Sequence, residues 1–265
     1  MRLATATVAA LLAAATAAHA QSDERAFCAA RPGKVSPTCT VSPGRVQLEV
    51  DAFDKTFDKS GGIKTTDTTF ATPQLRIGLS PNSEFQLAWT PYERVTTKGP
   101  RTSQADSGVG DAVAGLKFNL TDNRDGFGAA LQPFVKIPTA PTTLGNGKVE
   151  GGLTVPLSIP LSGGWTLALS PELDISADGS GSGYHTAGAV AAGFGHALSS
   201  EVSFGIELWA AQDFVSRSAT QATLDLMLAW APASARDLQL DVGLNLGLTS
   251  VTADTQVYVG IAKRF

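Results

Sequence analysis

From residue 45 to the carboxyl terminus, apolar and polar residues alternate in segments of about ten residues. Segment 238–248 shows the pattern most clearly, because Leu and Val dominate every second position while Gln239, Asp241 and Asn245 lie between them. Successive side chains of a strand point to opposite faces, so the alternation predicts strands with one apolar and one polar face. Gly, Pro, Asp, Asn and Ser separate the segments and predict turns.

Twelve strands follow from this pattern, and their connections alternate in length. Short turns at 80–82, 162–164 and 199–200 alternate with longer links near 58–69, 93–109, 139–148 and 177–185. An even strand number with short turns on one side is typical of outer-membrane barrels. We therefore predict an all-β fold, a closed antiparallel transmembrane β-barrel over residues 45–265. The predicted strands are 45–57, 70–79, 83–92, 110–120, 126–138, 149–161, 165–176, 186–198, 202–214, 220–231, 238–248 and 255–265.

The amino terminus predicts export. Residues 1–20 begin with Met1 and Arg2, continue with an apolar run and end in Ala18-His19-Ala20, which is the pattern of a secretory signal peptide. Residues 21–44 contain three prolines and no sustained periodicity. We interpret them as a short periplasmic leader that precedes the barrel.

Two cysteines, Cys28 and Cys39, lie in this leader and are the only ones in the chain. Disulfides persist in exported proteins, so the pair predicts a disulfide that closes a Pro/Gly-rich loop. No His or further Cys lies near them, and we expect no metal site and no cofactor.

Composition and charge narrow the class of protein. Hydrophobic residues make up 43% of the chain and charged residues 17%, whereas about a quarter of the residues are charged in a typical soluble protein. The net charge of −4 argues against nucleic acid as a partner, since that calls for a basic face. The expected location is the bacterial outer membrane, with its lipid as one partner. The barrel-assembly machinery is the other, through the carboxyl-terminal Phe265.

The energetics of lipid exposure assign the two faces. An Arg or Lys on the lipid face costs about 2–4 kcal/mol at the bilayer midplane. The apolar rows of the well-patterned segments contain essentially no charges, so we expect these rows to face lipid and the ionised rows to face the lumen. Trp209 has the inward parity and is expected to fill space. The candidate residues for lumen contact and selectivity are Glu49, Lys117, Lys136, Glu150, Glu172, Asp174, Glu207, Asp225 and Asp241.

Several short motifs resemble the "MetA-pathway of phenol degradation" group, a family of outer-membrane transporters. They are Arg31-Pro32-Gly33, the run 43–49 entering the first strand, 108–117, 135–139 and the closing run 258–265. The resemblance implies a barrel with a role in the passage of small molecules. It does not establish phenol as the substrate, and the cysteine pair departs from the usual leader of the group.

The sequence alone leaves four possibilities open. The first is a narrow, non-enzymatic channel for small, hydrophobic or aromatic molecules. Carboxylates outnumber cations on its inward face, which predicts a weak cation preference. The alternatives are a non-conducting barrel with a salt-bridged filling and an outer-membrane lipid hydrolase using His185 or His196, although neither carries a hydrolase signature. A soluble periplasmic β-barrel or sandwich shares the alternation but turns the apolar rows inward.

Overall fold

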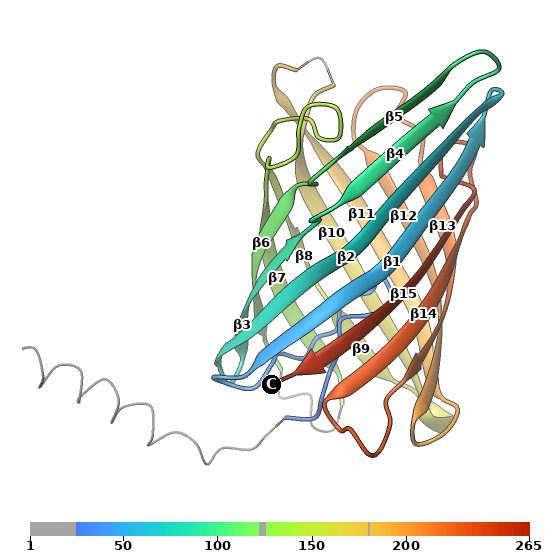
Figure 1. Cartoon of the computed structure of the whole chain (residues 1–265). Coiled ribbons are helices and arrows are strands. Elements are labelled where there is room, and N and C mark those ends of the chain that lie inside the picture. Colours follow the sequence, from blue (N-terminus) through green and yellow to red (C-terminus); the bar gives the residue numbers. More distant parts are fainter. Residues whose placement is uncertain (1–24, 122–125, 180) are drawn as a thin grey trace, which may run out of the picture.

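The computed structural model describes residues 25–121, 126–179 and 181–265. The predicted signal peptide lies outside these ranges. Within them, fifteen strand segments form one antiparallel sheet, and β1 pairs with both β2 and β15. This pairing closes the sheet into a barrel (Figure 1). The strands are β1 (Val46–Ser60), β2 (Ile63–Ser80), β3 (Ser83–Trp89), β4 (Glu93–Lys98), β5 (Ser103–Gly108), β6 (Ala112–Asn119), β7 (Gly128–Ile137), β8 (Glu150–Thr154), β9 (Leu157–Pro160), β10 (Trp165–Ala177), β11 (Tyr184–Ala197), β12 (Val202–Asp213), β13 (Gln221–Trp230), β14 (Leu238–Gly247) and β15 (Thr255–Arg264).

Three of the barrel's strands are each interrupted once. β3 and β4 both pair with β2, and β8 and β9 both pair with β10. β5 and β6 likewise form one barrel strand that is interrupted at residues 109–111. β5 pairs with β4, and β6 pairs with β3. The break between β8 and β9 contains Pro156, which has no N–H to give to the sheet. The described chain thus forms a closed twelve-stranded antiparallel barrel, and the sequence-based prediction of the fold is confirmed.

Two of the predicted long links are strand instead. Residues 58–69 belong to the β1–β2 hairpin, which turns at Gly61 and Gly62 with positive φ, and residues 93–109 belong mostly to the β4–β5 hairpin. These hairpins rise at the upper right of Figure 1. Their sequences are rich in Thr and lack apolar alternation. Strand pairing persists there without an apolar face, so the hydrophobic pattern ends before the strands do.

Apolar side chains lie on the outer surface of the barrel and charged side chains lie inside it, which is the reverse of a soluble protein. Leu173 and Leu208 are more than half exposed on the outer surface, whereas Arg76, Lys117 and Asp225 are fully buried within the barrel. A soluble barrel would place its apolar rows inward. The observed parity matches a barrel whose outer face meets lipid.

Among the described residues, no helix is long and apolar enough to span a membrane. One 3₁₀ turn, Ser162–Gly164, joins β9 to β10.

A charge in the lipid-facing row of β13 should destabilise the barrel. Leu226 lies between the buried, inward Asp225 and Met227 and therefore faces outward. We expect Leu226→Arg to lower the free energy of unfolding in lipid vesicles by about 2–4 kcal/mol, measured by urea titration of tryptophan fluorescence. Leu226→Ala, which removes apolar contact without adding charge, is the control. Equal losses in the two variants would contradict the lipid-facing assignment.

Candidate functional site

Residues 25–44, here called the leader segment, lie inside the lower half of the barrel as drawn in Figure 1. The sequence predicted a leader ahead of the barrel in the periplasm. The segment occupies the lumen instead, because inward polar side chains of the wall bind its backbone. A Pro/Gly-rich stretch that forms no strand must satisfy its N–H and C=O groups in another way, and the wall supplies those partners.

Arg76 of β2 connects the wall to the leader segment. Its guanidinium donates to Glu49 Oε1 at 2.8 Å and to Glu84 Oε1 at 2.9 Å. The two carboxylates accept backbone N–H groups of the leader segment, from Ala30 at 2.9 Å and from Val41 at 2.6 Å. All three charged side chains are buried, so each compensates charge that would otherwise be costly in the interior.

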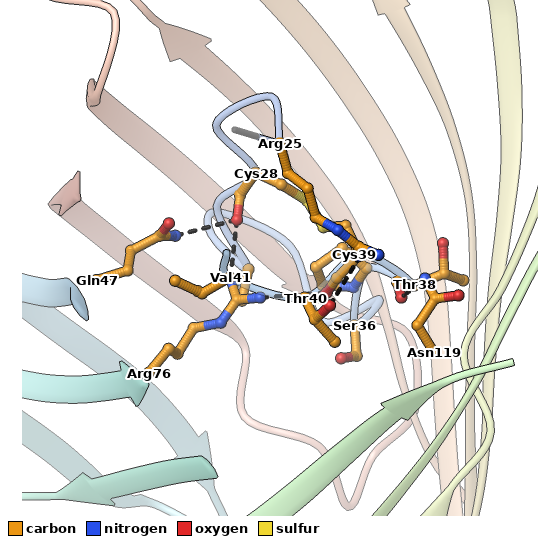
Figure 2. Close-up of a disulfide and its surroundings, with 12 residues drawn as sticks. Arg25, Cys28, Ser36, Thr38, Cys39, Thr40, Val41, Gln47, Arg76 and Asn119 are labelled. Carbon is orange, nitrogen blue, oxygen red and sulfur yellow. Dashed lines mark hydrogen bonds between the residues drawn. A yellow bond between two sulfur atoms is a disulfide. The ribbon is translucent and has the colours of Figure 1, made fainter. Parts of the chain in front are cut away.

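The predicted disulfide between Cys28 and Cys39 is present, and its loop is held at both ends. Arg76 donates to the carbonyl oxygen of Cys28 at 2.9 Å and to that of Cys39 at 3.3 Å (Figure 2). Gln47 also donates to the Cys28 carbonyl, at 3.0 Å. The cross-linked loop is therefore fixed to β1 and β2 through backbone oxygens.

Two side chains of β6 hold the far side of the same loop. Lys117 donates to the carbonyl oxygen of Pro37 at 2.9 Å, and Asn119 donates to that of Thr38 at 2.7 Å. Lys117 is fully buried and lies 3.9 Å from Glu84. This predicted lumen cation thus contacts the leader segment rather than open water.

Arg31 pairs with carboxylates from two other strands. It lies against Asp51 of β1, and its Nη2 donates to Asp241 of β14 at 2.8 Å. Tyr258 of β15 donates its hydroxyl to the carbonyl oxygen of Pro32 at 2.7 Å. An arginine keeps its charge at any physiological pH, so Arg31 ties the leader segment to β1 and β14, the two strands on either side of β15.

Lys34 reaches the adjoining strands β12 and β13. Its backbone N–H donates to Glu207 at 2.8 Å, and its Nζ donates to Asp225 at 2.9 Å and to Thr223 at 2.7 Å. The ammonium also lies 5.0 Å from the ring centre of Trp209, a favourable cation–π distance. Trp209 therefore makes a cation–π contact with Lys34 in addition to filling space.

The nine predicted lumen residues separate into two groups. Those that contact the leader segment are Glu49, Lys117, Glu207, Asp225 and Asp241. The other four lie on β7, β8 and β10. Lys136 pairs with Glu150 at 2.7 Å and with Asp111 at 3.1 Å, and Glu172 accepts a hydrogen bond from Thr154 at 2.6 Å. Asp174 lies on β10 two residues beyond Glu172.

The candidate set omitted Arg31, Lys34, Arg76 and Glu84, all of which form ion pairs in the lumen. Arg76 and Glu84 have the inward parity, and parity alone could have included them. Arg31 and Lys34, the leader cations, could have been found from a different signal. A leader with several cations precedes a wall with an excess of inward carboxylates, and this complementarity indicates that the two meet.

Two cavities flank the leader segment, and residues 30–33 line both. One of about 450 Å³ lies towards β9–β13, where Ala168, Gly193, Gly205 and Met227 are among its lining residues. The other, of about 320 Å³, lies towards β1, β2, β14 and β15. The leader segment thus narrows the lumen between two spaces of small-molecule size.

The two histidines considered for hydrolysis have other contacts. His185 Nδ1 lies 2.8 Å from Asp178 and its Nε2 3.5 Å from Asp213. His196 stacks on Trp165 with 4.6 Å between ring centres. Within the described ranges, no group of three or more His, Cys, Asp and Glu side chains is arranged to hold a metal ion.

Comparisons with known proteins agree with this architecture. The family model described as MetA-pathway of phenol degradation matches residues 29–265. An outer membrane channel from Pseudomonas putida F1 superposes with a TM-score of 0.70 at 13% identity, covering 89% of this chain and 99% of that one.

The translocator domain of the autotransporter NalP from Neisseria meningitidis gives a TM-score of 0.53 at 13% identity, covering 98% and 96% of the two chains. The β domain of the Bordetella autotransporter BrkA gives 0.54 at 14% identity, covering 84% and 100%. At these identities the likeness concerns the fold. No curated protein matches the sequence.

Removing the disulfide should loosen the leader segment without unfolding the barrel. A cross-link of this length contributes about 3 kcal/mol in the chain-entropy description, so we expect Cys28→Ser/Cys39→Ser to raise the rate of tryptic cleavage after Lys34 about tenfold or more. Mass spectrometry of reduced digests measures the rate. Cleavage after the exposed Arg217 in the β12–β13 loop is the internal control. Unchanged cleavage after Lys34 would show that the wall contacts alone hold the segment.

Proposed function

We propose that this protein, which belongs to the "MetA-pathway of phenol degradation" family, is an outer-membrane channel that passes small molecules through a narrow polar lumen. The observation that carries the proposal is the pair of cavities inside the barrel, separated by residues 30–33 of the leader segment. The fold shared with the Pseudomonas putida channel supports it.

The size of the cavities favours permeants of about one aromatic ring. A dry protein cavity of about 150 Å³ accepts benzene, and the two spaces here measure about 450 and 320 Å³. The family description suggests phenolic compounds as one class of permeant. In this proposal the protein moves such molecules and does not transform them.

The location we propose is the bacterial outer membrane. The outward apolar rows fit a lipid environment, and Phe265 follows β15 with its side chain 61% exposed. An exposed terminal aromatic residue beside the last strand is available for recognition by the barrel-assembly machinery. Short turns of outer-membrane barrels face the periplasm, which places the leader segment in the periplasmic half of the lumen.

The leader segment acts as the constriction of the channel. Arg31 bridges to Asp51 and Asp241, and Lys34 reaches Asp225, so the segment is tied to several walls at once. Passage requires either diffusion beside the segment or a shift of it. Charged side chains that line a constriction select ions and polar molecules in channels.

Releasing Arg31 should widen the passage. Arg31→Met removes the guanidinium that ties the leader segment to β1 and β14, and we expect the single-channel conductance in planar bilayers to rise roughly twofold or more. Lys59→Met, at an exposed position near the tip of the β1–β2 hairpin, is the matched control and should leave conductance unchanged. If neither the wild-type protein nor Arg31→Met conducts, the channel proposal is wrong and a structural barrel is favoured.

The channel should prefer cations weakly. Glu172 and Asp174 add two carboxylates to the polar row of β10. We expect a cation-selective reversal potential in a salt gradient and a smaller one for Glu172→Gln/Asp174→Asn. Glu201→Gln, on the exposed turn between β11 and β12, should change nothing. An anion-selective reversal potential would contradict the assigned sign.

A further inference from the structure

The β1–β2 and β4–β5 hairpins lie at the end of the barrel away from the leader segment, at the upper right of Figure 1. In β1, Asp54 lines a cavity of the lumen, so its parity is the inward one. Lys55 and Lys59 have the opposite parity, which they share with Phe57, a side chain that is 40% exposed. Because successive side chains of a strand point to opposite faces, both lysines lie on the outer face of the barrel.

The strand register extends this positive charge over three strands. Lys59 of β1, Lys64 of β2 and Lys98 of β4 lie directly opposite one another and form a row, here called the second basic row. Four residues back along β1 and β4, Lys55 and Arg94 form the first basic row, with one residue of β2 between them. Directly opposed residues lie on one face of a sheet, so all five basic side chains share the outer face.

The acidic side chains of the same strands lie on the other face. They share the inward parity and are Asp54, Asp58, Asp67, Glu93 and Asp106. Among the described residues, none of the five basic side chains forms an ion pair with a carboxylate. Lys55 instead lies 5.2 Å from the ring centre of Phe57. The outer face of these hairpins thus carries positive charge that the carboxylates of its own strands do not neutralise.

The second basic row is unfavourable for the stability of the chain on its own. Like charges that lie directly opposite one another destabilise a sheet, and Lys64 has a lysine on each side. Natural proteins break local rules of this kind mainly at functional sites. An anion bound over the row would remove the repulsion, so the row indicates a ligand with more than one negative charge.

Aromatic side chains mark the membrane boundary next to the basic rows. Phe70 lies between Phe53 and Tyr92, with ring centres 5.4 and 6.1 Å away, and both Phe70 and Tyr92 are exposed. Aromatic residues line the two interfaces of outer-membrane barrels. The first basic row follows Phe53 and Tyr92 at about 7 Å along the strands, and the second basic row lies at about 20 Å. Both rows therefore lie beyond the acyl chains, where the lipid headgroups are.

We propose that the two basic rows bind a lipid of the outer leaflet whose headgroup carries phosphate groups. Its acyl chains pack against the exposed ring of Phe70, and its phosphates accept hydrogen bonds from Arg94 and from the lysines of the second basic row. Basic clusters beside a membrane attract anionic lipids through the same charge interaction. The inference rests on the proposed location in the outer membrane and does not depend on conduction.

Lipid binding to the full-length protein in a neutral detergent tests the site. The probe is lipid A with two phosphate groups, and native mass spectrometry measures its affinity by titration. Lipid A with one phosphate group and phosphatidylcholine are the comparison lipids. One basic side chain beside an anionic surface contributes about fivefold in affinity. We therefore expect the form with two phosphates to bind about tenfold or more tighter than phosphatidylcholine, with the form with one phosphate between them.

A pair of variants locates the binding. Lys64→Gln/Lys98→Gln should weaken the binding of lipid A about tenfold or more, because it removes two charges of the second basic row. Arg217→Gln/Arg236→Gln removes the same charge from exposed loops outside β1, β2 and β4, and should leave the affinity unchanged. Equal weakening in the two variants, or equal affinity for lipid A and phosphatidylcholine, would overturn the site. Displacement of lipid A by millimolar inorganic phosphate, but not by chloride of the same ionic strength, would assign the rows to free phosphate and contradict the lipid.

Thermal unfolding separates a binding role of the second basic row from a structural one. Without anionic lipid, Lys64→Gln relieves the repulsion from both neighbouring lysines and should raise the melting temperature by about 1–3 °C. Added lipid A should then stabilise the unaltered protein more than Lys64→Gln, since a ligand stabilises the state that binds it. A lower melting temperature of Lys64→Gln without lipid would show that the row stabilises the hairpins by itself, against the proposal.

The location in the outer membrane is tested separately by membrane fractionation. A protein that fractionates with the outer membrane but shows no preference for lipid A contradicts the site and leaves the proposed location intact. Conductance of Lys64→Gln/Lys98→Gln in planar bilayers should equal that of the unaltered protein, because both lysines lie on the outer face. A large change in conductance would place these side chains in the permeation path and contradict the assignment.

Discussion

The buried guanidinium of Arg76 is the interaction on which the interior depends. It neutralises Glu49 and Glu84, and these carboxylates hold backbone N–H groups of the leader segment. The same guanidinium binds the carbonyl oxygens of Cys28 and Cys39. Removal of one of these side chains would leave a charged group or a backbone N–H or C=O group without a partner in the interior. The loss of stability would be far larger than the loss from breaking an ion pair on the surface. The position of the leader segment thus follows from charge balance in the wall.

That position divides the lumen. The disulfide loop is fixed against β1, β2 and β6, whereas Ala168, Gly193 and Gly205 leave a cavity on the side of β9–β13. Arg31 and Lys34 extend from the loop to the remaining walls. Charged side chains line both cavities, with Glu207 in the larger one and Asp51 and Asp54 in the smaller one.

Much of the fold was predictable because a lipid-spanning strand has a strict local rule. The parity that buries Asp225 and exposes Leu228 repeats every second residue along the strand, and it predicted the twelve-stranded barrel. The rule fails where lipid no longer acts. Residues 64–69 and 93–98 pair as strands without an apolar face, so their sequence resembled a loop.

The sequence by itself determined the alternating part of the strands, its parity and the cysteine pair, because the first two depend on neighbouring residues and the pair follows from the export signal. Only the tertiary structure decided where the leader segment lies. Arg31 meets Asp241 across 210 residues, and Lys34 meets Asp225 across 191. A segment without periodicity carries no local signal for such contacts, since its place depends on charges that come together only when the barrel closes.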